Sequence, residues 1–164
     1  MTIIEVVLAM VLLSMMLGAV LSAVELSART QHSTADRTYA RSLAADLLEE
    51  VCGFAYADPA GAAEYAVGGD ENAADRSTFD DVDDFDGWSE SPPSQADGTP
   101  VPGSAGWTRT VDVKWVDPQD PSIESVTETG AKRVQVGVSR GGVTYAVITR
   151  IRTAALDASA DTGG

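Results

Sequence analysis

The chain has 164 residues, 25 of them acidic and 11 basic, which gives a formal net charge of −14. This length suits one modest domain. The negative charge argues against a nucleic-acid partner, because binding to phosphates requires Lys and Arg to release counterions. The acidity is local: residues 53–100 hold twelve Asp or Glu and a single Arg76, whereas residues 101–164 hold seven acidic and seven basic side chains.

Residues 1–24 form an almost unbroken apolar run in which Glu5 is the only charged side chain. A run of this length predicts a membrane-spanning helix. An ionisable residue inside such a helix marks a functional position, because its burial is costly. No basic segment precedes the run and no Ala-x-Ala site ends it, so we expect it to be retained in the working protein. We assign residues 1–25 to the apolar half of a long helix.

Residues 26–52 continue this helix with an amphipathic pattern. They contain neither Pro nor Gly and are rich in helix-forming residues. A stripe of apolar side chains recurs every four positions, at Tyr39, Leu43, Leu47 and Val51. Such a stripe predicts one buried face. We therefore expect a single helix from about Thr2 to Val51, roughly 75 Å long, with Gly53 as its C-cap.

Residues 53–106 have the composition of an irregular connection. They are rich in Gly, Pro, Ala, Ser and Asp and poor in aliphatic side chains, a pattern typical of turns and loops. One short helical turn is expected near residues 59–65. We assign the whole span as an acidic, irregular loop.

Residues 107–153 alternate apolar and polar side chains, which is typical of antiparallel strands. The predicted strands are residues 107–116, 133–139 and 143–152, with a weaker candidate at 123–127. Gly141 and Gly142 form a two-residue hairpin turn between the last two strands. Residues 154–164 are expected to be a frayed tail. One long helix, an acidic loop and three or four antiparallel strands predict an α+β fold, with the apolar helix stripe covering the inner face of the sheet.

Residues 1–10, Met-Thr-Ile-Ile-Glu-Val-Val-Leu-Ala-Met, resemble the mature N-terminus of type IV pilins and of type II secretion pseudopilins. Thr2 and Glu5 hold the positions that they have in that family, and a long helix followed by an α+β head is the family's architecture. Residues 39–50 resemble the minor-pilin and I/V-type pseudopilin branch. Many pilins have a Pro at the position of Ser22, where their helix bends, and this chain departs from them there.

This resemblance implies a type IV pilin fold and a precursor whose short basic leader is removed by a prepilin peptidase. The new N-terminal residue, Met1, is then N-methylated. Thr2 and Glu5 become assembly residues: Glu5 of one subunit pairs with the Met1 amine of a neighbour in the apolar filament core, which neutralises a buried carboxylate and fixes the axial register. The alternative is that Glu5 lies near the membrane surface and snorkels.

The acidic run of residues 80–86 is a candidate calcium site, because Ca²⁺ favours several carboxylate and carbonyl oxygens in a flexible loop. The best candidate ligands are Asp81, Asp83, Asp84 and Asp86. Some pseudopilins hold calcium in a comparable loop. The EF-hand spacing does not fit, since aligning Gly87 with its glycine puts Val82 at the first ligand position and Pro93 at the last. A solvated acidic loop without metal is the alternative.

The expected function is structural. No nucleophile elbow, P-loop or HExxH spacing is present, so we predict that the protein is not an enzyme. We expect a pilin-like subunit that is held in the inner membrane before assembly and then joins a cell-surface or periplasmic filament. Its partners are copies of itself or other pilins and pseudopilins, together with an assembly platform and a cytoplasmic ATPase. The alternative is a single-span, membrane-anchored acidic binding module that depends on calcium.

Overall fold

The structure is a computed structural model that describes residues 2–59, 72 and 75–155. The chain divides into two compact units, Met1–Thr38 and Tyr39–Gly164, and each is described by itself. Met1, the predicted site of N-methylation, lies outside the described residues. So do residues 60–65 of the expected helical turn and residues 156–164 of the expected tail.

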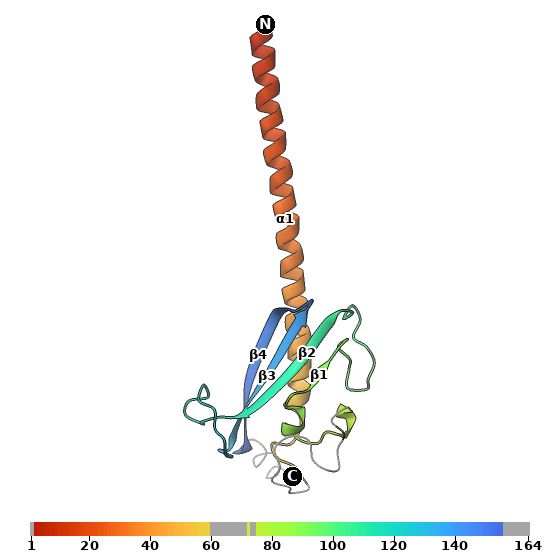
Figure 1. Cartoon of the computed structure of the whole chain (residues 1–164), viewed down its shortest axis with the longest axis vertical. Helices are drawn as coiled ribbons and strands as arrows, with labels where there is room; N and C mark the ends of the chain where they lie inside the picture. Colours follow the sequence, from red (N-terminus) through yellow and green to blue (C-terminus); the bar gives the residue numbers. More distant parts are fainter. Residues whose placement is uncertain (1, 60–71, 73–74, 156–164) are drawn as a thin grey trace. The chain divides into compact units, whose positions relative to one another are not determined.

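One long helix, α1 (Ile3–Val51), begins in the first unit and ends in the second (Figure 1). It confirms the predicted helix to within one residue. Two serines in its apolar half do not interrupt it, because their hydroxyls donate to carbonyl oxygens four residues earlier. Ser14 bonds to Met10 at 2.8 Å and Ser22 bonds to Gly18 at 3.0 Å. A serine placed in this way satisfies its own hydroxyl within the helix.

The C-terminal end of α1 differs from the expected glycine cap. The Gly53 amide donates to the Glu50 carbonyl at 3.0 Å, three residues back. Gly53 does not take the positive φ that a left-handed cap requires. The helix therefore ends in a tightened turn of the 3₁₀ type.

The second unit contains a four-stranded antiparallel sheet in the order β1-β2-β3-β4 (Figure 1). The strands are β1 (Ser89–Glu90), β2 (Trp107–Trp115), β3 (Ala131–Arg140) and β4 (Val143–Thr153). Gly141 and Gly142 join β3 to β4 with φ values of 58° and 79°, as a type I′ turn requires. The helix and sheet together confirm the α+β class and the predicted hairpin.

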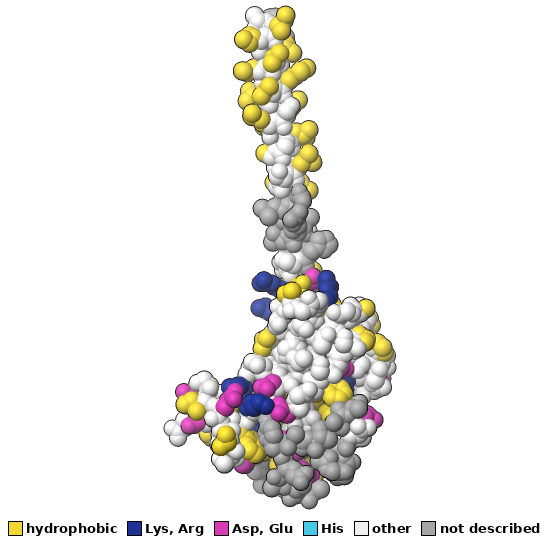
Figure 2. Space-filling view, in the orientation of Figure 1, with side chains coloured by type: hydrophobic (Ala, Val, Ile, Leu, Met, Phe, Trp, Pro, Cys, Tyr) yellow, Lys and Arg dark blue, Asp and Glu magenta, His cyan; other side chains and the backbone are white. Residues whose placement is uncertain are grey.

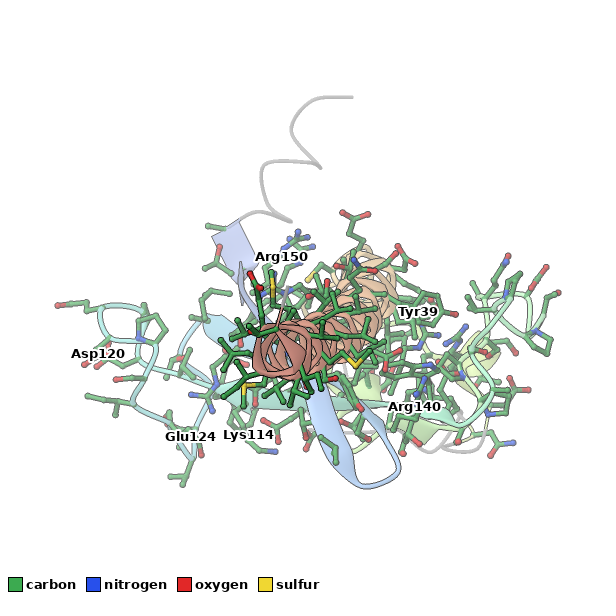
Figure 3. All side chains as sticks on the ribbon, turned by 90° about the horizontal axis from the view of Figure 1, so that it is seen from above. Tyr39, Lys114, Asp120, Glu124, Arg140 and Arg150 are labelled. Atoms are coloured by element: carbon green, nitrogen blue, oxygen red, sulfur yellow. The ribbon has the colours of Figure 1, made fainter. Side chains whose placement is uncertain are left out.

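The weaker strand candidate, residues 123–127, is wrong: it contributes an isolated bridge between Glu124 and Val116, the residue that follows β2. Aspartate side chains turn the chain here instead. Asp117 accepts the Gln119 amide at 2.7 Å, and Asp120 accepts the Ser122 amide at 3.1 Å. Such local bonds compete with strand pairing, and the loop that carries Asp120 projects to one side of the sheet (Figure 3).

The strand that the sequence analysis missed, β1, comes from the segment predicted to be irregular. Ser89 and Glu90 pair with Thr110 and Arg109 of β2. Two residues carry no periodicity from which a strand can be predicted. The segment also holds two short 3₁₀ turns, η1 (Arg76–Thr78) and η2 (Asp83–Phe85).

The core of the second unit lies between the last turns of α1 and the inner face of the sheet (Figure 1). Three residues of the predicted helix stripe, Leu43, Leu47 and Val51, are at most 1% exposed, and the fourth, Tyr39, is partly buried against the same core. The sheet faces it with a row of valines: Val111, Val113, Val134, Val136 and Val138. The expected packing of helix stripe on sheet is therefore confirmed.

Aromatic side chains anchor residues 79–90, here called the acidic segment, to this core. Phe79 packs edge-on against Phe85, with ring centroids 4.9 Å apart, and against Trp88 at 5.5 Å. Phe79 and Phe85 are at most 4% exposed. The residues around η2 are thus part of the folded head rather than a loop in solvent.

Candidate functional site

The first candidate site is the surface of the apolar half of α1. The stretch Ile3–Val24 is long and apolar enough to cross a membrane, and none of it is buried within the structure. Its large side chains stand free, with Ile3 at 86% and Leu13 at 69% exposure. Figure 2 shows apolar side chains along this part of the helix. A continuous apolar surface of this size needs lipid or other apolar helices around it.

Glu5 lies in the first turn of α1. Its amide and that of Val6 donate to the Thr2 carbonyl, at 3.1 and 3.4 Å. Thr2 therefore supplies the first acceptor of the helix, and the Glu5 carboxylate lies where the helix dipole favours negative charge. Residues 1–24 contain no Lys or Arg, so the apolar stretch itself supplies no basic side chain to pair with Glu5.

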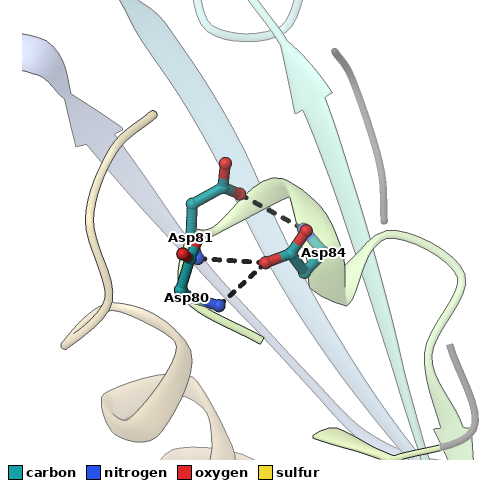
Figure 4. A group of neighbouring side chains, drawn as sticks. All are labelled: Asp80, Asp81 and Asp84. Carbon is teal, nitrogen blue, oxygen red and sulfur yellow. Dashed lines mark hydrogen bonds between the residues drawn. The ribbon is translucent and has the colours of Figure 1, made fainter. Parts of the chain in front are cut away.

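The second candidate site is the acidic run around η2. Asp80, Asp81 and Asp84 each offer a carboxylate oxygen within 4.8 Å of the others. Asp84 Oδ2 accepts the amides of Asp80 and Asp81, both at 3.0 Å, and Asp81 Oδ1 accepts the amide of Asp84 at 3.3 Å (Figure 4). Asp81 and Asp84 are each 3% exposed. The carboxylates of Asp81 and Asp84 therefore hold the turn together, while Asp80 is exposed.

The other two candidate calcium ligands point to lysines. Asp83 Oδ2 accepts from Lys132 Nζ at 2.7 Å. Asp86 accepts from Lys114 Nζ at 3.0 Å and from the Val113 amide at 2.9 Å. The structure thus brings together Asp81 and Asp84 of the four predicted ligands and adds Asp80. The spacing of Asp80 and Asp84, four residues apart, was the available signal for this third carboxylate.

Burial raises the pKa of two aspartates in this acidic run, Asp81 and Asp83. Burial, followed by the nearby charges of Asp84 and Asp83, raises the pKa of Asp81 from 3.8 to about 6. Burial also raises the pKa of Asp83, although the hydrogen bond and the charge of Lys132 oppose the shift. Removing a carboxylate from water disfavours its charged form. Asp81 and Asp83 therefore keep their protons to a higher pH than an ordinary aspartate does.

Lys132 is a buried residue that the sequence analysis did not single out. It lies on β3 with 1% of its surface exposed. Besides its bond to Asp83, Nζ donates to the Tyr56 carbonyl and lies 4.2 Å from the centre of the Tyr56 ring. The Tyr56 hydroxyl donates in turn to Glu128 at 2.6 Å. Burial and this bond raise the pKa of Tyr56 well above its usual range.

A second buried charge cluster joins the acidic segment to α1 and β2. Arg109 is 2% exposed; its Nε donates to Glu90 at 2.7 Å and its Nη1 to the Leu43 carbonyl at 3.2 Å. Arg76 pairs with the same Glu90 at 3.1 Å and with Glu50 at 3.3 Å. Burial raises the pKa of Glu50, opposed chiefly by the charge of Arg76. Strand alternation placed Arg109 on the inner face of β2, but the sequence showed no partner for it.

A pocket of about 350 Å³ lies beside this cluster, lined in part by Arg76, Trp88 and Ser94. Its charged groups are engaged with neighbours in the fold. The Arg76 guanidinium bonds to Glu90 and to the Ser94 carbonyl. We assign no ligand to this pocket, because the groups that could recognise one already hold the surrounding loop.

Comparison with known proteins identifies no relative: no protein-family model, no curated protein and no solved structure matches the chain. The functional argument therefore rests on the chain's own residues. None of these comparisons adds support to the pilin resemblance of residues 1–10.

Proposed function

We propose that the protein is a pilin-like structural subunit that assembles through the apolar half of α1 into a helical filament. The filament is a type II secretion pseudopilus or a type IV pilus. One observation carries the proposal: the unburied apolar surface of Ile3–Val24, with Glu5 as its only charge, continues as a single helix into a head with its own core.

In this proposal the helix occupies two environments in turn. Before assembly it spans the inner membrane, and the head lies outside the lipid. After a prepilin peptidase has exposed Met1, an assembly platform and a cytoplasmic ATPase move the subunit into the filament. There its apolar surface packs against copies of itself or related subunits. Lipid tails and apolar side chains are similar surroundings for Ile3–Val24, so the apolar residues do not oppose the transfer.

Glu5 distinguishes the two environments. An unpaired carboxylate in an apolar medium is costly, and a charged partner removes much of that cost. In the proposed filament the N-methylated amine of a neighbouring Met1 is this partner. Pairing would favour one axial position of each subunit over the others.

The test of this function is the Glu5→Leu variant. We expect it to insert into membranes as the unmodified chain does, but to enter filaments at least about tenfold less, which corresponds to a loss of ~1.4 kcal/mol per subunit. Glu5→Asp, which keeps the charge, should restore part of the incorporation. The measurement is the amount of the protein in sheared filaments relative to the membrane fraction. Normal incorporation of Glu5→Leu would contradict the proposal.

A second candidate function rests on the cluster of Asp80, Asp81 and Asp84: a membrane-anchored head that binds calcium. Millimolar Ca²⁺ should then raise the melting temperature of the full chain in detergent, and a chelator should reverse the increase. Asp84→Asn should abolish the response, whereas Asp120→Asn, a change in the exposed loop between β2 and β3, should preserve it. An unchanged melting temperature on adding Ca²⁺ to the unmodified chain would exclude this function. A binding module also predicts that Glu5→Leu is tolerated.

A further inference from the structure

The contact between Lys132 and Asp83 brings an amine and a carboxyl together away from water. Lys132 Nζ lies 2.7 Å from Asp83 Oδ2, and the two side chains are 1% and 5% exposed. They come from distant parts of the sequence, β3 and η2. Both elements are held by the core, so the two groups remain in contact while the head is folded.

The surroundings of this pair contain more acid than base. Asp81 and Asp84 lie on the same turn as Asp83, and Glu128 accepts from the hydroxyl of Tyr56, whose carbonyl accepts from Lys132. Formation of an amide requires a neutral amine and a neutral carboxylic acid. The 2.7 Å contact is the path by which one proton would pass from Nζ to the carboxyl before the reaction.

Two further contacts fit this reaction. Nζ donates to the Tyr56 carbonyl and lies over the Tyr56 ring, which holds the amine against Asp83. Asp83 Oδ1 is buried and makes no hydrogen bond within the described part of the chain. This oxygen can remain as the carbonyl of an amide without giving up a partner.

We propose that Lys132 and Asp83 become joined by an amide bond in the folded protein. The Nζ lone pair attacks Cγ of the protonated Asp83, the Cγ–Oδ2 bond breaks, and Oδ2 leaves as water with the hydroxyl proton and one amine proton. The carbonyl oxygen Oδ1 remains. No oxidant or other reactant is needed, and the water leaves a site that excludes solvent, which disfavours the reverse reaction.

Such a bond would close a covalent loop between η2 and β3. The chain has one cysteine, so it cannot form an internal disulfide, and an amide would supply the missing covalent constraint on the unfolded state. This inference is independent of the proposed filament function. A filament subunit could lack the bond, and a protein with another function could contain it.

The test is the mass of the intact, full chain purified in detergent. We expect it to be lower than the sequence mass by one water molecule, after allowing for N-terminal methylation. Lys132→Arg, which keeps the charge but offers no primary amine, should show its full sequence mass. Trypsin should leave residues 77–109 joined to residues 115–133 in a single branched peptide, because a linked Lys132 is not cleaved.

An unmodified mass in the folded protein would overturn the proposal. Loss of water alone is insufficient, since Asp-Gly sequences also dehydrate, and the chain has two of them at Asp86-Gly87 and Asp97-Gly98. Water loss that maps to a linear peptide would therefore overturn the proposal as well. Asp83→Asn offers a second check: attack on a carboxamide releases ammonia, so this variant should lose the mass of ammonia instead of water.

Discussion

Asp81 illustrates how a single residue can support the fold and also oppose it. Its carboxylate accepts the amides of Asp83 and Asp84 and so fixes the turn at η2. The same carboxylate is buried beside two others, which raises its pKa to about 6. The folded protein therefore binds this proton more tightly than the unfolded chain does. By linkage, the stabilising effect is complete below about pH 4 and is lost as pH rises through about 6.

We predict that Asp81→Asn removes this pH dependence. The amide oxygen of Asn can still accept the two backbone N–H groups, and no charge remains to be buried. At pH 7.5 the variant should be more stable than the unmodified chain by about 3 kcal/mol, since the pKa of Asp81 rises from 3.8 to about 6 and one pKa unit corresponds to ~1.4 kcal/mol. At pH 4 the difference should be small. The measurement is the free energy of unfolding of the full chain in detergent across this range.

Asp112→Asn is the matched control, because Asp112 is half exposed beside Lys114 on β2. The same acid-to-amide change there should leave the pH dependence between 4 and 6 as it was. If Asp81→Asn lost stability at pH 7.5, the turn would need the charge itself, and the burial argument would be wrong.

At the scale of elements, the sequence predicted those parts of the fold that depend on long repeats or on tight turns. The helix followed from an uninterrupted run of helix formers, and the hairpin followed from Gly141 and Gly142. β1 could not be predicted, because its position beside β2 depends on contacts between distant parts of the chain, from Arg109 to Glu90 and from the Val113 amide to Asp86. The candidate metal cluster was found in part, since Asp83 and Asp86 are each paired with a different lysine, Lys132 and Lys114, and spacing along the sequence does not show such pairs.

We predict that the hairpin tolerates only residues that accept a positive φ. Gly141→Asn should leave stability nearly unchanged, because Asn followed by Gly suits a type I′ turn. Gly141→Val should lower the free energy of unfolding by about 1–2 kcal/mol, the usual cost of a left-handed conformation with a β-carbon. Both variants lose the glycine, so the difference between their free energies of unfolding, measured with denaturant, reports the backbone strain alone. Equal stability of the two variants would show that β4 pairs without the turn.

At the scale of the whole molecule, the chain combines an apolar helix that the structure leaves uncovered with a head that has its own core. Among the residues whose side chains the structure describes, those of α1 that belong to the core of the head lie in its last turns, from Tyr39 onward. The exposed half of α1 contributes nothing to that core, since none of Ile3–Val24 is buried. The two parts should therefore be separable.

We predict that a chain beginning at residue 26 is water-soluble and keeps its sheet. The intact chain should remain in the membrane after alkaline carbonate washing, and the shortened chain should not. Near-ultraviolet circular dichroism of the buried Trp107 should be the same for both. Replacing Leu12 and Leu13 with Asp in the intact chain is the control, because two charges at mid-helix should reduce membrane retention at unchanged length. A shortened chain that unfolds would show that the head needs the apolar half of α1.

The bonds from Ser14 and Ser22 to the backbone have a consequence for how such a helix exchanges neighbours. Because each hydroxyl is satisfied within the helix, neither serine needs a polar group from lipid or from another protein. The helix can rotate or slide along a neighbour without breaking a hydrogen bond at these positions. Along residues 2–24, only the Glu5 carboxylate carries a charge that responds to such sliding. In the proposed filament, sliding would therefore be opposed at one position of this surface, where Glu5 is paired with a cation of the neighbouring subunit.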